Sequence, residues 1–122
     1  MSNKYIVCIW KRDPARWAQL WGNLALLKEH MLYFAPLTKK GVIVLGGPFV
    51  DSDGGLDIML VDSIEEAKRL REGDPLFVHG VQGDAKYFEL EVHIPPSKRL
   101  PEVHEKLQKA SQQILGVPEE YF

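Results

Sequence analysis

Apolar positions fall into four short runs that predict the strands of a sheet. Residues 4–10 (KYIVCIW) are apolar on both faces, which is typical of a strand in the middle of a sheet. Residues 42–47 (VIVLGG) and 56–61 (LDIMLV) are separated by the turn-forming residues 48–55, so we expect them to form a hairpin. Residues 86–94 (KYFELEVHI) alternate between apolar and polar and predict a fourth strand.

A helical period of apolar residues follows the first strand. Asp13 and Pro14 are an N-cap residue and a first-turn proline, and they predict a helix from there to about Thr38. Gly22 and Pro36 weaken the pattern locally. The apolar stripe of this helix consists of Trp17, Leu20, Trp21, Leu24, Leu27, Met31 and Phe34.

Two further helices are predicted in the second half of the chain. Ser63 and Glu66 have the spacing of a capping box, which places the start of a helix over residues 63–72. Residues 95–101 form a proline-rich linker, and residues 102–116 form a weakly amphipathic final helix.

The order of these elements predicts an α+β fold, the ferredoxin-like βαββαβ arrangement with an antiparallel four-stranded sheet and an extra C-terminal helix. We expect residues 1–94 to form the domain and residues 95–122 to form a linker and a helix that packs on it. Two helices cover one face of such a sheet and leave the other bare and apolar. The second face therefore predicts a homodimer that packs sheet on sheet.

Composition narrows the function classes. The chain has 122 residues, of which 45% are hydrophobic, enough for one domain with a substantial core. Its net charge of -2 argues against a nucleic-acid footprint. No apolar run approaches the length of a membrane span, and the N-terminal run is too short for a signal peptide, so we expect a soluble cytoplasmic protein. The single cysteine, Cys8, excludes an intrachain disulfide and is expected to be a buried, inert thiol.

Two residues are the first candidates for chemistry. His30 lies beside the apolar stripe, so it is either a packed histidine bonded to a carbonyl group or a general acid and base. Asp74 precedes Pro75 and repeats the capping pattern of Asp13 and Pro14. A second role is compatible with capping, because Asp74 can accept a hydrogen bond from His30 and fix its tautomer.

Weaker candidates lie at strand ends and turns. Gly46, Gly47 and Pro48 form either a tight bend or a place where a ligand approaches the backbone. His79 either lines a pocket near Asp74 or faces solvent.

The predicted fourth strand carries one set of metal-ligand residue types. Glu89, Glu91 and His93 alternate onto one face, where they form either a metal site or, as we expect, a polar sheet face. We predict no metal and no cofactor.

Four motifs resemble the YciI-like family. They occur in order within EHMLYFAPLTKKGVIVLGGPFVDSDGG and VDSIEEAKRLREGDPLFVHGV, and the resemblance covers about residues 5 to 93. The motifs are a helical histidine at His30, Gly47-Pro48 after the second strand, the helix start Ser63–Ala67, and the turn Asp74–Gly80.

The resemblance implies a ferredoxin-like protomer of a dimeric α+β barrel, with His30 and Asp74 as its active-site pair. One characterised type in this family removes chloride from a chlorinated hydroxyquinol, and muconolactone isomerases share the wider barrel fold. Both move protons without a cofactor. Leu76 stands where the family turn usually has phenylalanine, and Phe77 follows it, so the resemblance implies an altered pocket wall at Phe77. The tail from Pro95 lies outside the pattern.

These observations lead to one hypothesis and one alternative from another class. The hypothesis is a cofactor-independent enzyme in which His30, oriented by Asp74, moves a proton in an isomerisation or elimination on a small cyclic or phenolic acid. Backbone N–H groups near Gly46 and Gly47 would stabilise the developing oxyanion. The alternative is a non-catalytic dimeric module that binds a small ligand.

Overall fold

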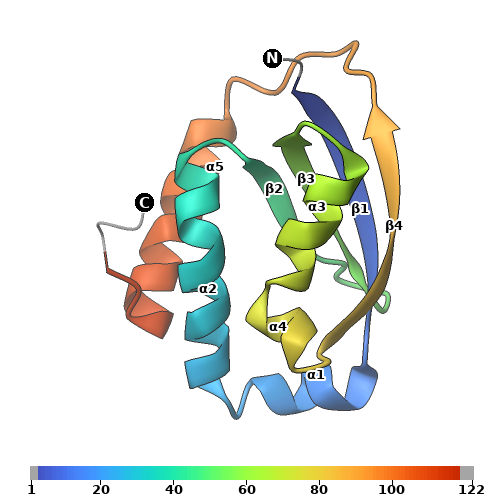
Figure 1. Ribbon diagram of the computed structural model, residues 1–122. Coiled ribbons are helices and arrows are strands. Elements are labelled where there is room, and N and C mark those ends of the chain that lie inside the picture. The colour runs from blue at the N-terminus through green and yellow to red at the C-terminus, as the bar shows by residue number, and fades with distance from the viewer. Residues whose placement is uncertain (1–2, 119–122) are drawn as a thin grey trace.

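An antiparallel four-stranded sheet in the order β2-β3-β1-β4 organises the computed structural model, which describes residues 3–118 (Figure 1). The central strands β1 and β3 pair with each other, β4 pairs with β1, and β2 pairs with β3. The chain therefore has the predicted α+β ferredoxin-like fold. The strands are β1 (Lys4–Arg12), β2 (Ile43–Pro48), β3 (Gly55–Val61) and β4 (Gln82–Leu90).

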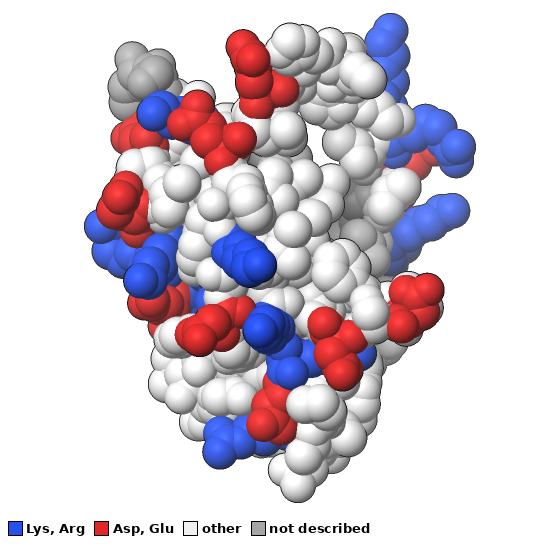
Figure 2. Space-filling view, turned by 90° about the vertical axis from the view of Figure 1, so that its right-hand side faces the viewer, with Lys and Arg blue, Asp and Glu red and all other residues white. Residues whose placement is uncertain are grey.

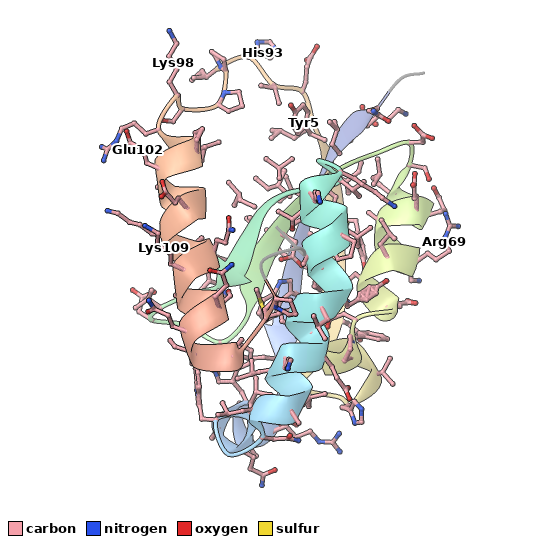
Figure 3. The ribbon with its side chains drawn as sticks, turned by 90° about the vertical axis from the view of Figure 1, so that its left-hand side faces the viewer. Tyr5, Arg69, His93, Lys98, Glu102 and Lys109 are labelled. Atoms are coloured by element: carbon pink, nitrogen blue, oxygen red, sulfur yellow. The ribbon has the colours of Figure 1, made fainter. Side chains whose placement is uncertain are left out.

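Helices α2 and α3 cover one face of the sheet (Figure 1). The C-terminal helix α5 stands beside α2 on the side away from α3, with Glu102 and Lys109 pointing away from the body (Figure 3). A π-helical turn over Ser111–Leu115 then brings the chain back to α2. The helices are α1 (Pro14–Leu20), α2 (Leu24–Lys39), α3 (Ile64–Glu72), α4 (Pro75–Val78) and α5 (Leu100–Ala110).

The predicted helix from Pro14 to Thr38 is wrong in its continuity, because two helices occupy this segment. The break lies at Gly22, and the Asn23 side chain then caps α2 by accepting a hydrogen bond from the Leu26 N–H at 3.2 Å. Trp21 consequently leaves the apolar stripe and is 65% exposed.

The predicted fourth strand is shifted toward the N-terminus. It begins at Gln82, which pairs with Arg12 beyond a register shift, and it ends at Leu90, the partner of Tyr5. Because β1 begins at Lys4, residues 91–94 extend past the end of the ladder and are not strand. The final helix also begins earlier than predicted, at Leu100.

The two faces of the sheet differ in what covers them. The helix-covered face holds a buried cluster that joins the two central strands to α3, made of Ile6, Cys8, Met59, Val61 and Ala67. The open face carries exposed apolar side chains, namely Ile9, Leu45, Phe88 and Leu90. The predicted bare apolar face is therefore present.

Charged residues of both signs are interspersed on the face that Figure 2 shows. No helix within residues 3–118 is long and apolar enough to cross a membrane.

Burial makes the single thiol unreactive. Cys8 is fully buried, and desolvation, together with the nearby Asp57, raises its pKa from 9.0 to about 12. The thiolate fraction near neutral pH is therefore about a thousandfold below that of a free thiol. We expect iodoacetamide, followed by mass spectrometry, to leave Cys8 unmodified in the native protein and to alkylate it in guanidinium chloride. Equal labelling rates in both states would contradict this burial.

Candidate functional site

Asp74 is fixed by the start of a short helix. It is the N-cap of α4, with Pro75 at the first position, and its Oδ1 accepts a hydrogen bond from the Leu76 N–H at 3.0 Å. The side chain is 1% exposed. The capping role predicted from Asp-Pro is confirmed, and capping holds the carboxyl group in one place below α2.

His30 reaches the same carboxyl oxygen from the middle of α2. Its Nδ1 lies 2.8 Å from Asp74 Oδ1, and its side chain is 22% exposed. A carboxylate has only acceptors, so this contact places the proton on Nδ1 and leaves Nε2 free to accept one. The Phe34 ring packs edge-on against the imidazole, with 5.1 Å between the two ring centroids, and helps to fix the plane of the imidazole.

Tyr33 lies on another side of the Asp74 carboxyl group. Its hydroxyl donates to the Leu70 carbonyl at 2.7 Å, and its ring crosses Gly73 so closely that a Cβ there would lie 2.4 Å from the hydroxyl oxygen. Burial, and then the charge of Asp74, raise the pKa of Tyr33. Tyr33 is therefore a neutral wall of the site.

A buried guanidinium group lies nearby on α3. Arg71 is 1% exposed and donates to the carbonyl of Gly83. Its guanidinium carbon stands 5.2 Å from the centre of the Phe77 ring. Phe77, expected to contact substrate, thus packs against Arg71 in this structure.

Sequence reasoning missed Asp57, which lies on the helix-covered face of β3 opposite Gly46 of β2. A Cβ at Gly46 would lie 2.2 Å from Asp57 Oδ1, whereas one at Gly47 would meet nothing within 4 Å. Position 46 must therefore be glycine, because the Asp57 carboxyl group occupies the space that a side chain would need. The available signal was a carboxylate two positions before Met59, on the buried face of an apolar strand.

Burial raises the pKa of Asp57 from 3.8 to about 6. A positive charge on the His30 ring, present only when the ring is protonated, lies near enough to oppose this rise. Asp57 and His30 therefore belong to the same electrostatic environment.

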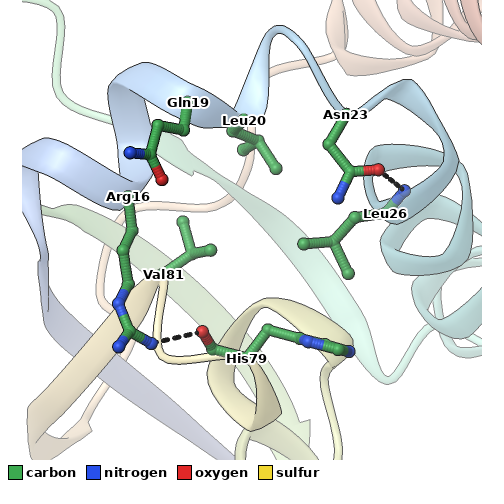
Figure 4. Close-up of a pocket in the computed structure, with 7 residues that line it drawn as sticks. All are labelled: Arg16, Gln19, Leu20, Asn23, Leu26, His79 and Val81. Carbon is green, nitrogen blue, oxygen red and sulfur yellow. Dashed lines mark hydrogen bonds between the residues drawn. The ribbon is translucent and has the colours of Figure 1, made fainter.

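His79 belongs to a separate cavity. This cavity of about 360 Å³ lies between α1, α2 and the end of α4 (Figure 4), and neither His30 nor Asp74 lines it. Arg16 Nη1 donates to the His79 carbonyl oxygen at 2.8 Å, which closes one side. The predicted site residues are thus dispersed: Gly46, Gly47 and Pro48 are on β2, Phe77 is under Arg71, and His79 is in this cavity.

The hypothetical metal face on the fourth strand is not a single strand face. Glu89 is in β4, but Glu91 and His93 follow its end, where His93 Nε2 and Glu91 Oε2 form an exposed pair at 3.1 Å. Within residues 3–118 no group of three His, Cys, Asp or Glu side chains is placed to hold a metal ion.

The fold and the His30–Asp74 contact define a ferredoxin-like α+β protein with a histidine held by a buried carboxyl group under its helical layer. The chain belongs to the family defined by the YCII-related domain, whose model matches residues 5–91. The match ends close to the predicted boundary at residue 94 and leaves α5 outside it.

A solved structure shares this fold. It is the 5-chloro-2-hydroxyhydroquinone dehydrochlorinase TftG from Burkholderia phenoliruptrix AC1100, in complex with 2,5-dihydroxybenzoquinone. The TM-score is 0.57 and the identity is 23%, over 71% of this chain and 93% of that one. No curated protein sequence matches the chain.

Proposed function

We propose that the protein is a cofactor-independent enzyme that moves a proton on a small cyclic or phenolic acid, in an isomerisation or an elimination. The observation that carries this proposal is the 2.8 Å contact between His30 Nδ1 and Asp74 Oδ1, with the imidazole still partly exposed. Such a contact orients a base whose free Nε2 can take a proton from substrate. The dehydrochlorinase with the same fold supports the choice of reaction and of a hydroxylated six-membered ring as substrate.

Loss of the base tests the proposal. We expect His30→Gln to reduce chloride release from 5-chloro-2-hydroxyhydroquinone, or isomerisation of a related lactone, by about a hundredfold or more. The matched control is His93→Gln, because His93 is exposed beyond β4. Equal rates for wild type and His30→Gln, with chloride and ring products both measured, would rule out this function.

We further propose that the functional unit is a homodimer, a dimeric α+β barrel in which two open sheet faces meet. Phe88 is 51% exposed and lies on that face with Ile9, Leu45 and Leu90, so a second copy would remove a continuous apolar surface from water.

Charge placed on this face should separate the protomers. We expect Phe88→Lys to elute as a monomer in size-exclusion chromatography with light scattering, while Val78→Lys, exposed on α4, keeps the wild-type mass. A monomeric wild-type protein at micromolar concentration would contradict the dimer.

The alternative, a non-catalytic binding module, is favoured by one observation. An apolar groove of about 450 Å³ lies between the open face and the linker before α5, lined in part by Leu45, Ile58 and Leu100. A ligand in this groove would raise the melting temperature equally in wild type and in His30→Ala. Stabilisation by a hydroxylated aromatic acid that is lost in His30→Ala would instead favour the dyad as the binding place.

A further inference from the structure

Three residues from three strands form a row on the helix-covered face, below the helix that carries His30. Gly46 of β2 pairs with Asp57 of β3, and Asp57 pairs with Cys8 of β1. Cys8 is fully buried, Asp57 is half-buried and Gly46 is exposed. The row therefore runs from the buried core to solvent, and the Asp57 carboxyl group lies between the buried and the exposed residue.

The Asp57 carboxyl group takes the space of the missing side chain at Gly46. Only 2.2 Å separates Oδ1 from the position of a Cβ at Gly46, while Gly47 has open space. Without a side chain at Gly46, the edge strand presents only backbone beside this acidic group, and the open space at Gly47 lies on the opposite face of the sheet. A planar ligand can approach the carboxyl group over the bare backbone at Gly46.

Three buried polar atoms in this region have no hydrogen-bond partner within residues 3–118. They are Asp74 Oδ2, Arg71 Nε and Trp10 Nε1, in side chains that are almost fully buried. The Trp10 indole N–H approaches Asp57 as a donor and lowers its pKa, so Asp57 itself accounts for this group. Asp74 Oδ2 has no such donor among the described residues, and because buried polar atoms are rarely left unpaired, it supports a polar ligand beside Asp57.

We propose that Asp57 donates a proton to a substrate oxygen while His30 removes a proton from the adjoining carbon, so that the substrate is a cyclic carbonyl compound able to enolise. This proposal rests on the proposed function and assigns it a second proton-transfer group. It adds to the backbone N–H groups near Gly46 and Gly47 a side chain that can transfer a whole proton.

The step balances without an oxidant or a cofactor. The substrate C–H bond breaks and its proton forms a bond to His30 Nε2, while the electron pair becomes the C=C bond of an enol. The carbonyl π pair moves to oxygen, which takes the Asp57 proton. An imidazolium, a carboxylate and the enol remain. In an isomerisation the carboxylate takes the proton back from the enol oxygen while the imidazolium protonates a second carbon. Where chloride leaves, the carboxylate again takes the enol proton, the enol electrons expel chloride, and the imidazolium gives its proton to water.

Groups on every packed element set the proton affinity of Asp57. Burial is the largest cause and raises its pKa to about 6, so an appreciable acid fraction persists near neutral pH. The charged and titratable groups that face it are His30 on α2, Arg71 on α3, Asp74 at the start of α4 and Cys8 on β1. Of these, Arg71 lowers the pKa, His30 lowers it only after it has taken a proton, and Asp74 raises it.

The test measures enolisation directly. Wild type, Asp57→Asn, His30→Gln and the exposed control Asp62→Asn are incubated in deuterium oxide with hydroxylated cyclohexenones and hydroxyquinones, and deuterium incorporation is followed by NMR. We expect Asp57→Asn to be slower than wild type by about a hundredfold or more, and Asp62→Asn to be unchanged. We also expect the wild-type rate to fall at high pH as Asp57 ionises, and Asp57→Asn to lose this dependence.

The outcomes separate this proposal from the one on which it rests. If His30→Gln is slow while Asp57→Asn matches wild type, the proposal for Asp57 is overturned and the proposed function stands. If wild type exchanges no faster than buffer, the proposed function fails and Asp57 loses this role with it.

A second variant tests the geometry with Asp57 left in place. Gly46→Ala puts a methyl group where the carboxyl oxygen lies and should reduce exchange, whereas Gly22→Ala, between α1 and α2 and with only ordinary contact to Gln19, should not. Equal rates in these two variants would overturn the placement of Asp57 beside the substrate.

Discussion

Replacing Asp74 with alanine is expected to lower the free energy of unfolding by about 3 kcal/mol and the melting temperature by about 12 °C. Two donors lose their acceptor at once, since Asp74 Oδ1 bonds both the Leu76 N–H and His30 Nδ1. Loss of a cap costs about 1 kcal/mol, and a buried donor left without a partner costs about 2 kcal/mol more. Thermal unfolding followed by circular dichroism measures the change.

The chain supplies a matched control in Asp13, which also precedes a proline and caps a helix. Asp13 accepts from the Arg16 N–H at 2.9 Å, but it is exposed and has no histidine partner. Asp13→Ala should therefore cost only about 1 kcal/mol. Equal losses in the two variants would mean that the His30 contact adds nothing to stability.

Asp57→Asn is expected to stabilise the protein at neutral pH, by up to about 3 kcal/mol. Burial raises the pKa of Asp57 from 3.8 to about 6, so folding favours the protonated form. The unfolded chain releases its proton first as the pH rises, so the contribution of Asp57 to stability is complete below pH 3.8 and is lost on passing through pH 6. Asparagine does not ionise, so the Asp57→Asn variant does not lose this stability as the pH rises.

Urea unfolding at a series of pH values between about 4 and 8 checks this prediction. Other groups titrate in both proteins, so the difference between the two stability curves reports Asp57. The difference should grow over this range and level off above pH 6, where the carboxyl group of the folded wild type is ionised. Parallel curves would show that folding does not change the proton affinity of Asp57. A variant that is more stable and less active distinguishes a functional carboxyl group from a structural one.

The short-range signals in the sequence predicted most of the fold. Each Asp-Pro pair caps a helix, because a side chain acceptor and a fixed φ angle act within three residues. Ser63 caps α3 as expected, but Glu66 bonds the N–H of Asp62 and not that of Ser63. The stripe from Trp17 to Phe34 did not reveal the break at Gly22, since apolar spacing continues across it.

The residues of the candidate site show the same difference between short-range signals, which the sequence reveals, and contacts set by tertiary structure, which it does not. His30 and Asp74 were paired through motif order and capping, and the structure brings them together at 2.8 Å. Asp57 was not found, because its role depends on which residue of β2 it faces. That register includes a shift between Ile43 and Leu45, which no local pattern in the sequence specifies.

The contact between Gly46 and Asp57 also constrains how this sequence can change over generations. A side chain at position 46 and a carboxyl group at position 57 exclude each other in space, so their substitutions are epistatic. Loss of Asp57 first would open position 46 to alanine, whereas the reverse order passes through a strained intermediate. Descendants that have given up the carboxyl group should therefore be the ones in which position 46 begins to vary.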